Sequence, residues 1–122
     1  MQMSRNVAVI NAGGWGTALA VMLAKQGHAV QLWARREALA DEISLARENA
    51  AYLPGVAVPG TVRVTADLAA AVAEAEIVVI AVVASYMAEI GRQLSGRLRP
   101  EAMVVHGTKG LEPERWRRLS QV

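Results

Sequence analysis

The chain has 122 residues, of which 53% are hydrophobic and 20% are charged, so its composition is globular and excludes a disordered chain. Its length suits one domain. The absence of cysteine excludes disulfide scaffolds, thiolate metal sites and cysteine nucleophiles. The formal net charge is only +2, and the basic residues are scattered, so we expect no nucleic-acid partner. The longest near-apolar runs are shorter than a bilayer span of ~20 residues, so we expect a cytoplasmic protein without a membrane span.

The first third of the chain predicts a strand, a helix and a second strand. Asn6–Asn11 is short, apolar and bounded by glycines, which favours a buried strand. Trp15–Lys25 has apolar residues at helical spacing and stops before Gly27, a typical helix terminator. His28–Trp33 alternates between apolar and polar residues, as a strand does.

The middle of the chain predicts a helix, a loop, a strand and a further helix. Arg36–Asn49 carries Leu39, Ile43 and Ala46 at helical spacing, and these residues are its expected buried face. Tyr52–Gly60 contains two prolines and two glycines and is predicted to be a loop. Thr61–Thr65 is predicted to be a short strand, and Asp67–Ala75 a helix capped by Asp67.

The last third predicts two strands and two helices. Glu76–Val83 is apolar on both faces, which is typical of a central strand in a covered parallel sheet. Ser85 could cap a helix over Tyr86–Leu98, and Ala102–His106 is a fifth strand. After a tight loop at 107–110, Pro113 is suited to the first turn of a final helix, 114–122.

Strand and helix thus alternate five times with short links, the pattern of a doubly wound parallel α/β sheet. We expect a Rossmann-type sheet with helices on both faces and the five predicted strands in the order 3-2-1-4-5. A single domain, residues 1–122, accounts for the whole chain.

The first strand–helix junction carries a glycine pattern that predicts dinucleotide binding. Gly13 and Gly16 occupy the second and third positions of the G-x-G-x-x-G fingerprint, and Asn11 replaces the first. Asn tolerates the backbone angles of a tight turn. The second glycine leaves room for a pyrophosphate, and the third lets helix and strand pack closely. The alternative is a turn that binds some other phosphate.

Two basic sites lie at predicted strand ends, where ligands of open α/β sheets bind. Arg35 and Arg36 follow the second strand, where an arginine can accept the 2′-phosphate of NADP and an acidic residue such as Glu37 favours NAD. Both interpretations stay open. A third is that Arg35, Arg36 and Glu37 only form the solvent-exposed start of a helix. Lys109 lies between two glycines after the fifth strand, and its charge suits a phosphate or a developing alkoxide. A surface lysine in a turn is the alternative. No cluster of metal ligands is evident in the sequence.

Several segments in order resemble bacterial NAD(P)-dependent glycerol-3-phosphate dehydrogenase. They are Val9–Ala20, Leu32–Arg35, Asn49–Gly55, Thr65–Leu68 and Thr108–Glu112. The resemblance implies reversible reduction of dihydroxyacetone phosphate to sn-glycerol 3-phosphate in phospholipid synthesis. It also implies cofactor contacts at Gly14, Trp15 and Arg35, and contact of Lys109 with both cofactor and substrate.

The sequence departs from that family at three points. Asn11 replaces the first fingerprint glycine, and Val83-Ala84-Ser85 stands where the family usually has Val-Pro-Ser. Nothing in the chain matches the family's helical substrate domain, which carries its main catalytic base. We therefore expect a fragment that binds NADP or NAD without turning over. An apolar edge left by that domain predicts a homo-oligomer.

Two other readings remain open. The chain could be the N-terminal domain of another two-domain reductase, of the opine or ketopantoate type. It could also be a non-catalytic nucleotide-binding module.

Overall fold

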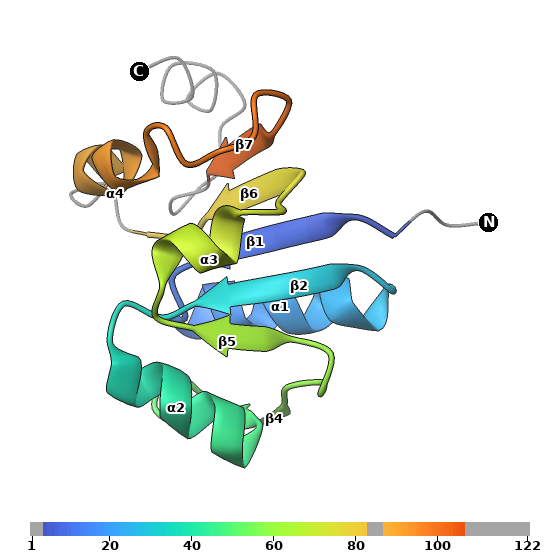
Figure 1. Ribbon diagram of the computed structural model, residues 1–122. Coiled ribbons are helices and arrows are strands. Elements are labelled where there is room, and N and C mark those ends of the chain that lie inside the picture. Colours follow the sequence, from blue (N-terminus) through green and yellow to red (C-terminus); the bar gives the residue numbers. More distant parts are fainter. Residues whose placement is uncertain (1–3, 83–86, 107–122) are drawn as a thin grey trace.

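A five-stranded parallel sheet forms the centre of the molecule (Figure 1). The computed structural model describes residues 4–82 and 87–106. The sheet has the strand order β5-β2-β1-β6-β7, and every neighbouring pair is parallel. Its strands are β1 (Asn6–Ile10), β2 (Ala29–Trp33), β5 (Arg63–Thr65), β6 (Ile77–Ile80) and β7 (Met103–His106). This order confirms the predicted arrangement of the five strands and places β1 at the centre.

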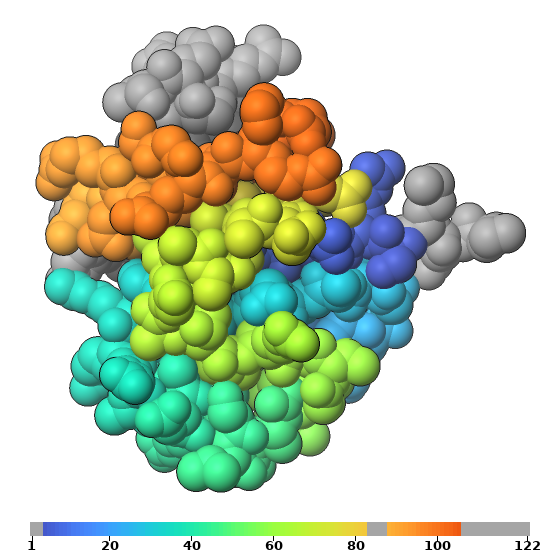
Figure 2. Space-filling model, in the orientation of Figure 1, coloured from blue at the N-terminus to red at the C-terminus, as the bar shows by residue number. Residues whose placement is uncertain are grey.

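Strand β1 separates two buried clusters because its side chains alternate between the faces of the sheet. Val7 and Val9 enter one cluster, and Ala8 and Ile10 enter the other. The first, the α1–α2 cluster, receives helices α1 (Gly14–Lys25) and α2 (Glu37–Ala46). The second, the α3–α4 cluster, receives α3 (Leu68–Val72) and α4 (Met87–Leu94), which pack side by side (Figure 2). Both faces are therefore covered, as the apolar strands predicted.

Helix ends agree with two of the sequence signals. Gly27 follows α1 with φ 97°, a left-handed conformation that glycine adopts without steric cost. The carboxylate of Asp67 accepts a hydrogen bond of 3.2 Å from the backbone N–H of Ala70 and caps α3. None of the described helices is both long and apolar enough to cross a bilayer. The predictions for Ser85, the loop at 107–110 and the helix at 114–122 fall outside the described residues.

The region after α2 corrects two predictions. The helix ends at Ala46, not Asn49, and Ala46 is exposed while Ala40 is buried with Leu39 and Ile43. The predicted loop at 52–60 contains a strand, β4 (Leu53–Ala57), which pairs antiparallel with β3 (Glu48–Asn49).

The physical reason for this correction lies in Arg47 and in the isolation of the hairpin. Arg47 leaves the helix with φ 52° and ψ 40°, and its guanidinium donates to the carbonyl oxygens of Val58, Pro59 and Val62. The hairpin is a separate two-stranded sheet, so Pro54 and Gly55 lie on an edge strand, where such residues are tolerated.

Candidate functional site

The turn between β1 and α1 has the tight geometry that its sequence predicted. Asn11 adopts φ 102°, a region that few residues other than glycine occupy. Its backbone N–H donates to the carbonyl of Trp33 at 3.0 Å, and its Nδ2 donates to the carbonyl of Ala81 at 3.2 Å. Asn11 therefore links the ends of β2 and β6 across the centre of the sheet.

Two of the three glycines in the turn are required by neighbouring backbone. A Cβ on Gly16 would lie 2.0 Å from the carbonyl oxygen of Asn11, so only glycine allows the helix to approach the strand this closely. A Cβ on Gly14 would lie 2.8 Å from the carbonyl oxygen of Tyr52. By contrast, among the described residues a Cβ on Gly13 would meet only Nδ2 of Asn11, at an ordinary 3.6 Å. Packing within the described part of the chain therefore explains Gly14 and Gly16 but does not explain Gly13.

Within the part of the chain that the structure describes, the first turn of α1 has no side-chain cap. Gly13 is the N-cap residue, in an extended conformation, and it has no side chain to accept a hydrogen bond. The first turn also contains no acidic residue. Among residues 4–82 and 87–106, no side chain therefore caps the positive end of the helix dipole or its first backbone N–H groups, and such a helix end can bind anions. Trp15, in this turn, is 48% exposed.

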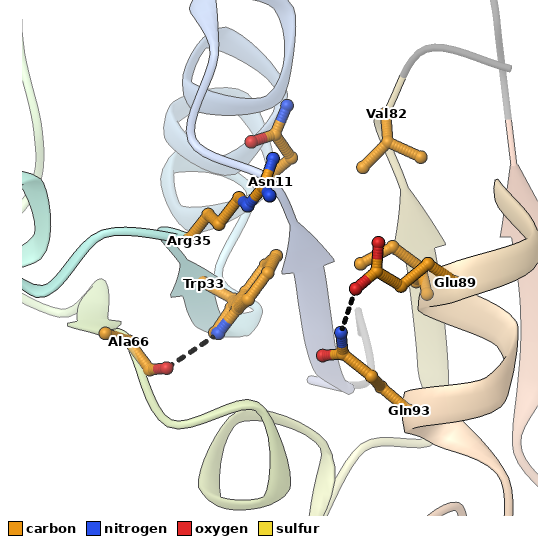
Figure 3. A pocket seen from close by; sticks show the side chains of 8 residues that line it. Asn11, Trp33, Arg35, Ala66, Val82, Glu89 and Gln93 are labelled. Carbon is orange, nitrogen blue, oxygen red and sulfur yellow. Dashed lines mark hydrogen bonds between the residues drawn. The ribbon is translucent and has the colours of Figure 1, made fainter. Parts of the chain in front are cut away.

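A cavity of about 450 Å³ lies beside this turn, at the carboxyl ends of the strands. One side is formed by Asn11, Trp33, Arg35 and Ala66, and the other by Val82 and α4. The indole Nε1 of Trp33 donates to the carbonyl of Ala66 at 2.9 Å, which fixes the ring at the cavity (Figure 3). Because Asn11 belongs to both features, the glycine turn and the cavity form one continuous site.

The structure separates the candidates after β2. Arg35 lines the cavity and lies next to Asn11 (Figure 3). Arg36 is the exposed N-cap residue of α2, and Glu37 is in the first turn of that helix. Neither lines the cavity. Lys109 lies outside the described residues.

Sequence reasoning missed the side chains that α4 contributes. Glu89, Ile90 and Gln93 line the cavity opposite Arg35, and Nε2 of Gln93 donates to Oε1 of Glu89 at 3.4 Å (Figure 3). The predicted strand order contained a signal for these residues. In this order β6 lies beside β1, where the order of the strands reverses, and α4 is the helix that follows β6. A helix in that position passes the crevice where ligands of such sheets bind. Two polar residues four positions apart on that helix share one face.

Sequence reasoning also missed Asn49, which is 1% exposed. Its Nδ2 donates to the carbonyl of Ala12 and to Oγ1 of Thr17, both at 2.8 Å. Its Oδ1 accepts from the backbone N–H of Tyr52 at 3.3 Å. No local pattern marks this residue, because the two groups to which its Nδ2 donates lie more than 30 residues away.

Known proteins are similar to this chain in both sequence and fold. The chain is 48% identical over 120 residues to a glycerol-3-phosphate dehydrogenase (NAD(P)+) of Moorella thermoacetica, covering 98% of this chain and 36% of that protein. The crystal structure of glycerol-3-phosphate dehydrogenase from Coxiella burnetii has a TM-score of 0.82 at 31% identity, covering 91% of this chain and 34% of that one. The structure of such an enzyme from Saccharomyces cerevisiae has a TM-score of 0.81 at 27% identity, covering 90% and 35%.

The similarity extends over nearly the whole of this chain, which spans about a third of the length of the curated relatives it matches. Residues 6–122 match the family model described as NAD-dependent glycerol-3-phosphate dehydrogenase N-terminus. The resemblance seen in the sequence is thereby confirmed, and the chain belongs to the NAD-dependent glycerol-3-phosphate dehydrogenase N-terminal family.

Proposed function

We propose that this chain binds NAD or NADP across the glycine turn and the adjoining cavity. The observation that carries the proposal is the uncapped N-terminus of α1, which adjoins a cavity of about 450 Å³ through Asn11. A pyrophosphate suits the backbone N–H groups and the dipole of this helix. The adenosine half then occupies the cavity, beside Trp33 and Ile90.

The residues of the site fit such a cofactor. Packing among the described residues does not require a glycine at Gly13, and the reason that we assign to it is room for a phosphate. Arg35 is placed to accept the 2′-phosphate of NADP or to stack on the adenine. Gly14 and Trp15 belong to the turn, and Arg36 follows the cavity residue Arg35 in the chain, and we assign secondary contacts to these three. Bound NAD(P)H supplies a hydride.

The reaction we propose for the whole enzyme is the reversible reduction of dihydroxyacetone phosphate to sn-glycerol 3-phosphate, in glycerophospholipid synthesis. Lys109 is the residue of this chain that we assign to both cofactor and substrate, because its cation can hold a phosphate or a developing alkoxide. We assign the main catalytic base to a helical substrate domain. About two thirds of the length of the Moorella relative lies outside the part that this chain matches, which is room for such a domain. We further propose a cytoplasmic enzyme that acts as a homo-oligomer.

Family membership favours this function over an opine-type or ketopantoate-type reductase. The non-catalytic nucleotide-binding module predicts cofactor binding as well, so binding alone does not separate it from an enzyme domain. The separating measurement is turnover once a substrate domain is supplied.

The test therefore has two parts. The chain is titrated with NADH and NADPH by cofactor fluorescence, and we expect binding without oxidation on addition of dihydroxyacetone phosphate. The chain is then fused to the remaining length of the Moorella relative. We expect the chimera to oxidise the cofactor when dihydroxyacetone phosphate is added, and Lys109→Ala to reduce this rate about 100-fold or more.

Each part can contradict the proposal. Failure of the chain to bind either cofactor would exclude the cofactor site. Turnover by the chain alone, abolished by Lys109→Ala, would show that a substrate domain is dispensable. A folded chimera that bound cofactor but reduced nothing would favour the non-catalytic module.

A further inference from the structure

The β3–β4 hairpin supports the glycine turn from the interior of the protein. Asn49 uses both of its amide hydrogens, one for the carbonyl of Ala12 and one for Oγ1 of Thr17, at 2.8 Å each. Asn49 is 1% exposed and Thr17 is 0% exposed. Water therefore does not compete for these hydrogen bonds, and a lost partner would leave a buried polar group unsatisfied.

The bond to Ala12 determines which way the next N–H points. The peptide between Ala12 and Gly13 is trans, as all described peptide bonds are. In a trans peptide the carbonyl and the N–H point in opposite directions. The Ala12 carbonyl points inward to Asn49, so the N–H of Gly13, the N-cap residue of α1, points away from the buried Asn49.

The hairpin is itself anchored, so Asn49 is a fixed donor. At its base, Arg47 binds three carbonyls, and the backbone N–H of Val58 donates to the carbonyl of Arg47 at 2.8 Å. Val58 is buried in the α1–α2 cluster. At its tip, the carbonyl of Tyr52 lies against Gly14 so closely that a Cβ there would be 2.8 Å away. The turn is thus held from one side by a side chain and a main-chain group of the same hairpin.

We propose that Asn49 is a positioning residue for cofactor phosphates. By holding the Ala12–Gly13 peptide, it presents the Gly13 N–H to the diphosphate of a bound dinucleotide. This inference rests on the proposed function, because it requires the diphosphate to lie at the turn. It predicts that Asn49 affects the diphosphate part of the ligand and leaves the adenosine part unaffected.

The test compares two ligands in the Asn49→Leu variant, which keeps the number and branching of the side-chain heavy atoms and removes both donors. NADH carries the diphosphate, and adenosine carries none. We expect the dissociation constant for NADH to rise about tenfold to a hundredfold, the range for one charge-assisted hydrogen bond. The dissociation constant for adenosine, measured by NMR chemical-shift titration, should not change.

Thr17→Val is the matched control. It removes the hydroxyl acceptor from the same network but leaves the bond from Asn49 to Ala12. We expect it to lower the free energy of unfolding in urea without changing the ratio of the two dissociation constants. Circular dichroism shows whether each variant is folded. If Asn49→Leu is unfolded, Asn49→Ser, which also lacks the amide, is measured in its place with the same expectation.

A second readout reports on the peptide directly. In the wild-type chain we expect the Gly13 amide resonance to shift when NADH is added, and in the Asn49 variant we expect this shift to be lost. Equal losses for NADH and adenosine, or no loss for NADH while the wild type binds it, would overturn the role of Asn49. A wild-type chain that binds no NADH would instead overturn the proposed function, and this inference with it.

Discussion

The two halves of the proposed cofactor site are built in opposite ways. The turn half presents main-chain groups, and it is fixed by glycines that backbone neighbours require and by the buried amide of Asn49. The cavity half presents exposed side chains, among them Arg35, Glu89 and Gln93. Substitution of these three exposed residues can alter the second half without disturbing the fold, whereas the first half can hardly change. We infer that the turn supplies general affinity for a dinucleotide and that the cavity selects between NAD and NADP.

The largest effect should come from the turn half. In Gly16→Ala, the new Cβ would lie 2.0 Å from the Asn11 carbonyl, and this backbone atom cannot move without separating α1 from β1. We expect the free energy of unfolding to fall by at least about 3 kcal/mol, the upper end for overpacking. Gly91→Ala in α4 is the control, because a Cβ there meets open space. The free energy of unfolding of Gly91→Ala should rise by about 0.5–1 kcal/mol, because alanine favours a helix over glycine. An unchanged stability of Gly16→Ala in urea would show that the turn tolerates a side chain.

The next effect tests the cavity half. Arg35→Ala removes a cation from the cavity, and we expect NADPH to lose about tenfold to a hundredfold in affinity, the range for a charge-assisted pair. NADH should lose much less, and both losses are measured by fluorescence titration. Arg36→Ala is the matched control, with a smaller loss expected because Arg36 does not line the cavity. Equal losses of NADH and NADPH in Arg35→Ala would leave that residue as a stacking partner for the adenine.

A smaller effect concerns the conformation of Asn11. Asn11→Ala places a residue without a favourable side chain at φ 102° and removes the bond to Ala81. We expect a loss of about 1–2 kcal/mol in the free energy of unfolding, the cost of a left-handed residue. Asn11→Gly loses the same bond but accepts this backbone angle, so it should recover most of that stability. If the two variants unfolded at the same urea concentration, the backbone conformation at position 11 would not be the cause of the lost stability.

The smallest effect should come from Glu89, whose carboxylate lines the same cavity as Arg35. A negative charge there opposes a 2′-phosphate, so Glu89→Gln should raise the affinity for NADPH. The gain should be about twofold to fivefold, as expected for exposed charges, and NADH should be less affected. Glu37→Gln is the control, because Glu37 is outside the cavity lining. If only Glu37→Gln changed the affinity for NADPH, Glu37 and not Glu89 would be the acidic residue that disfavours NADP, as the sequence suggested.

Most of the fold was predictable because it depends on local patterns. The apolar run in β6 and the glycine after α1 each carry their information within a few residues. The hairpin was not predictable, because Pro54 and Gly55 are typical of loops and the strand there depends on pairing with Glu48–Asn49, outside the segment.

The candidate site divides in the same manner. Asn11, Gly16 and Arg35 could be placed from their distance to a strand end. Asn49 and Glu89 could not, because their roles depend on which distant elements the fold brings against them. Arg35 and Arg36 differ by one position, and only the start of α2 determines which of them lines the cavity.

The central position of β1 has a consequence for synthesis on the ribosome. Nearly all of the α1–α2 cluster comes from residues 7–64, so this half can begin to pack early. Ala8 and Ile10, on the other face of the same strand, have Trp33 as an early partner, but the rest of their buried cluster comes from residues between 68 and 94. At about 5–20 residues per second, the delay is roughly 2–6 s. For that interval the nascent chain displays an apolar sheet face, and we expect chaperones that recognise such surfaces to bind this intermediate and to release it once α4 has emerged.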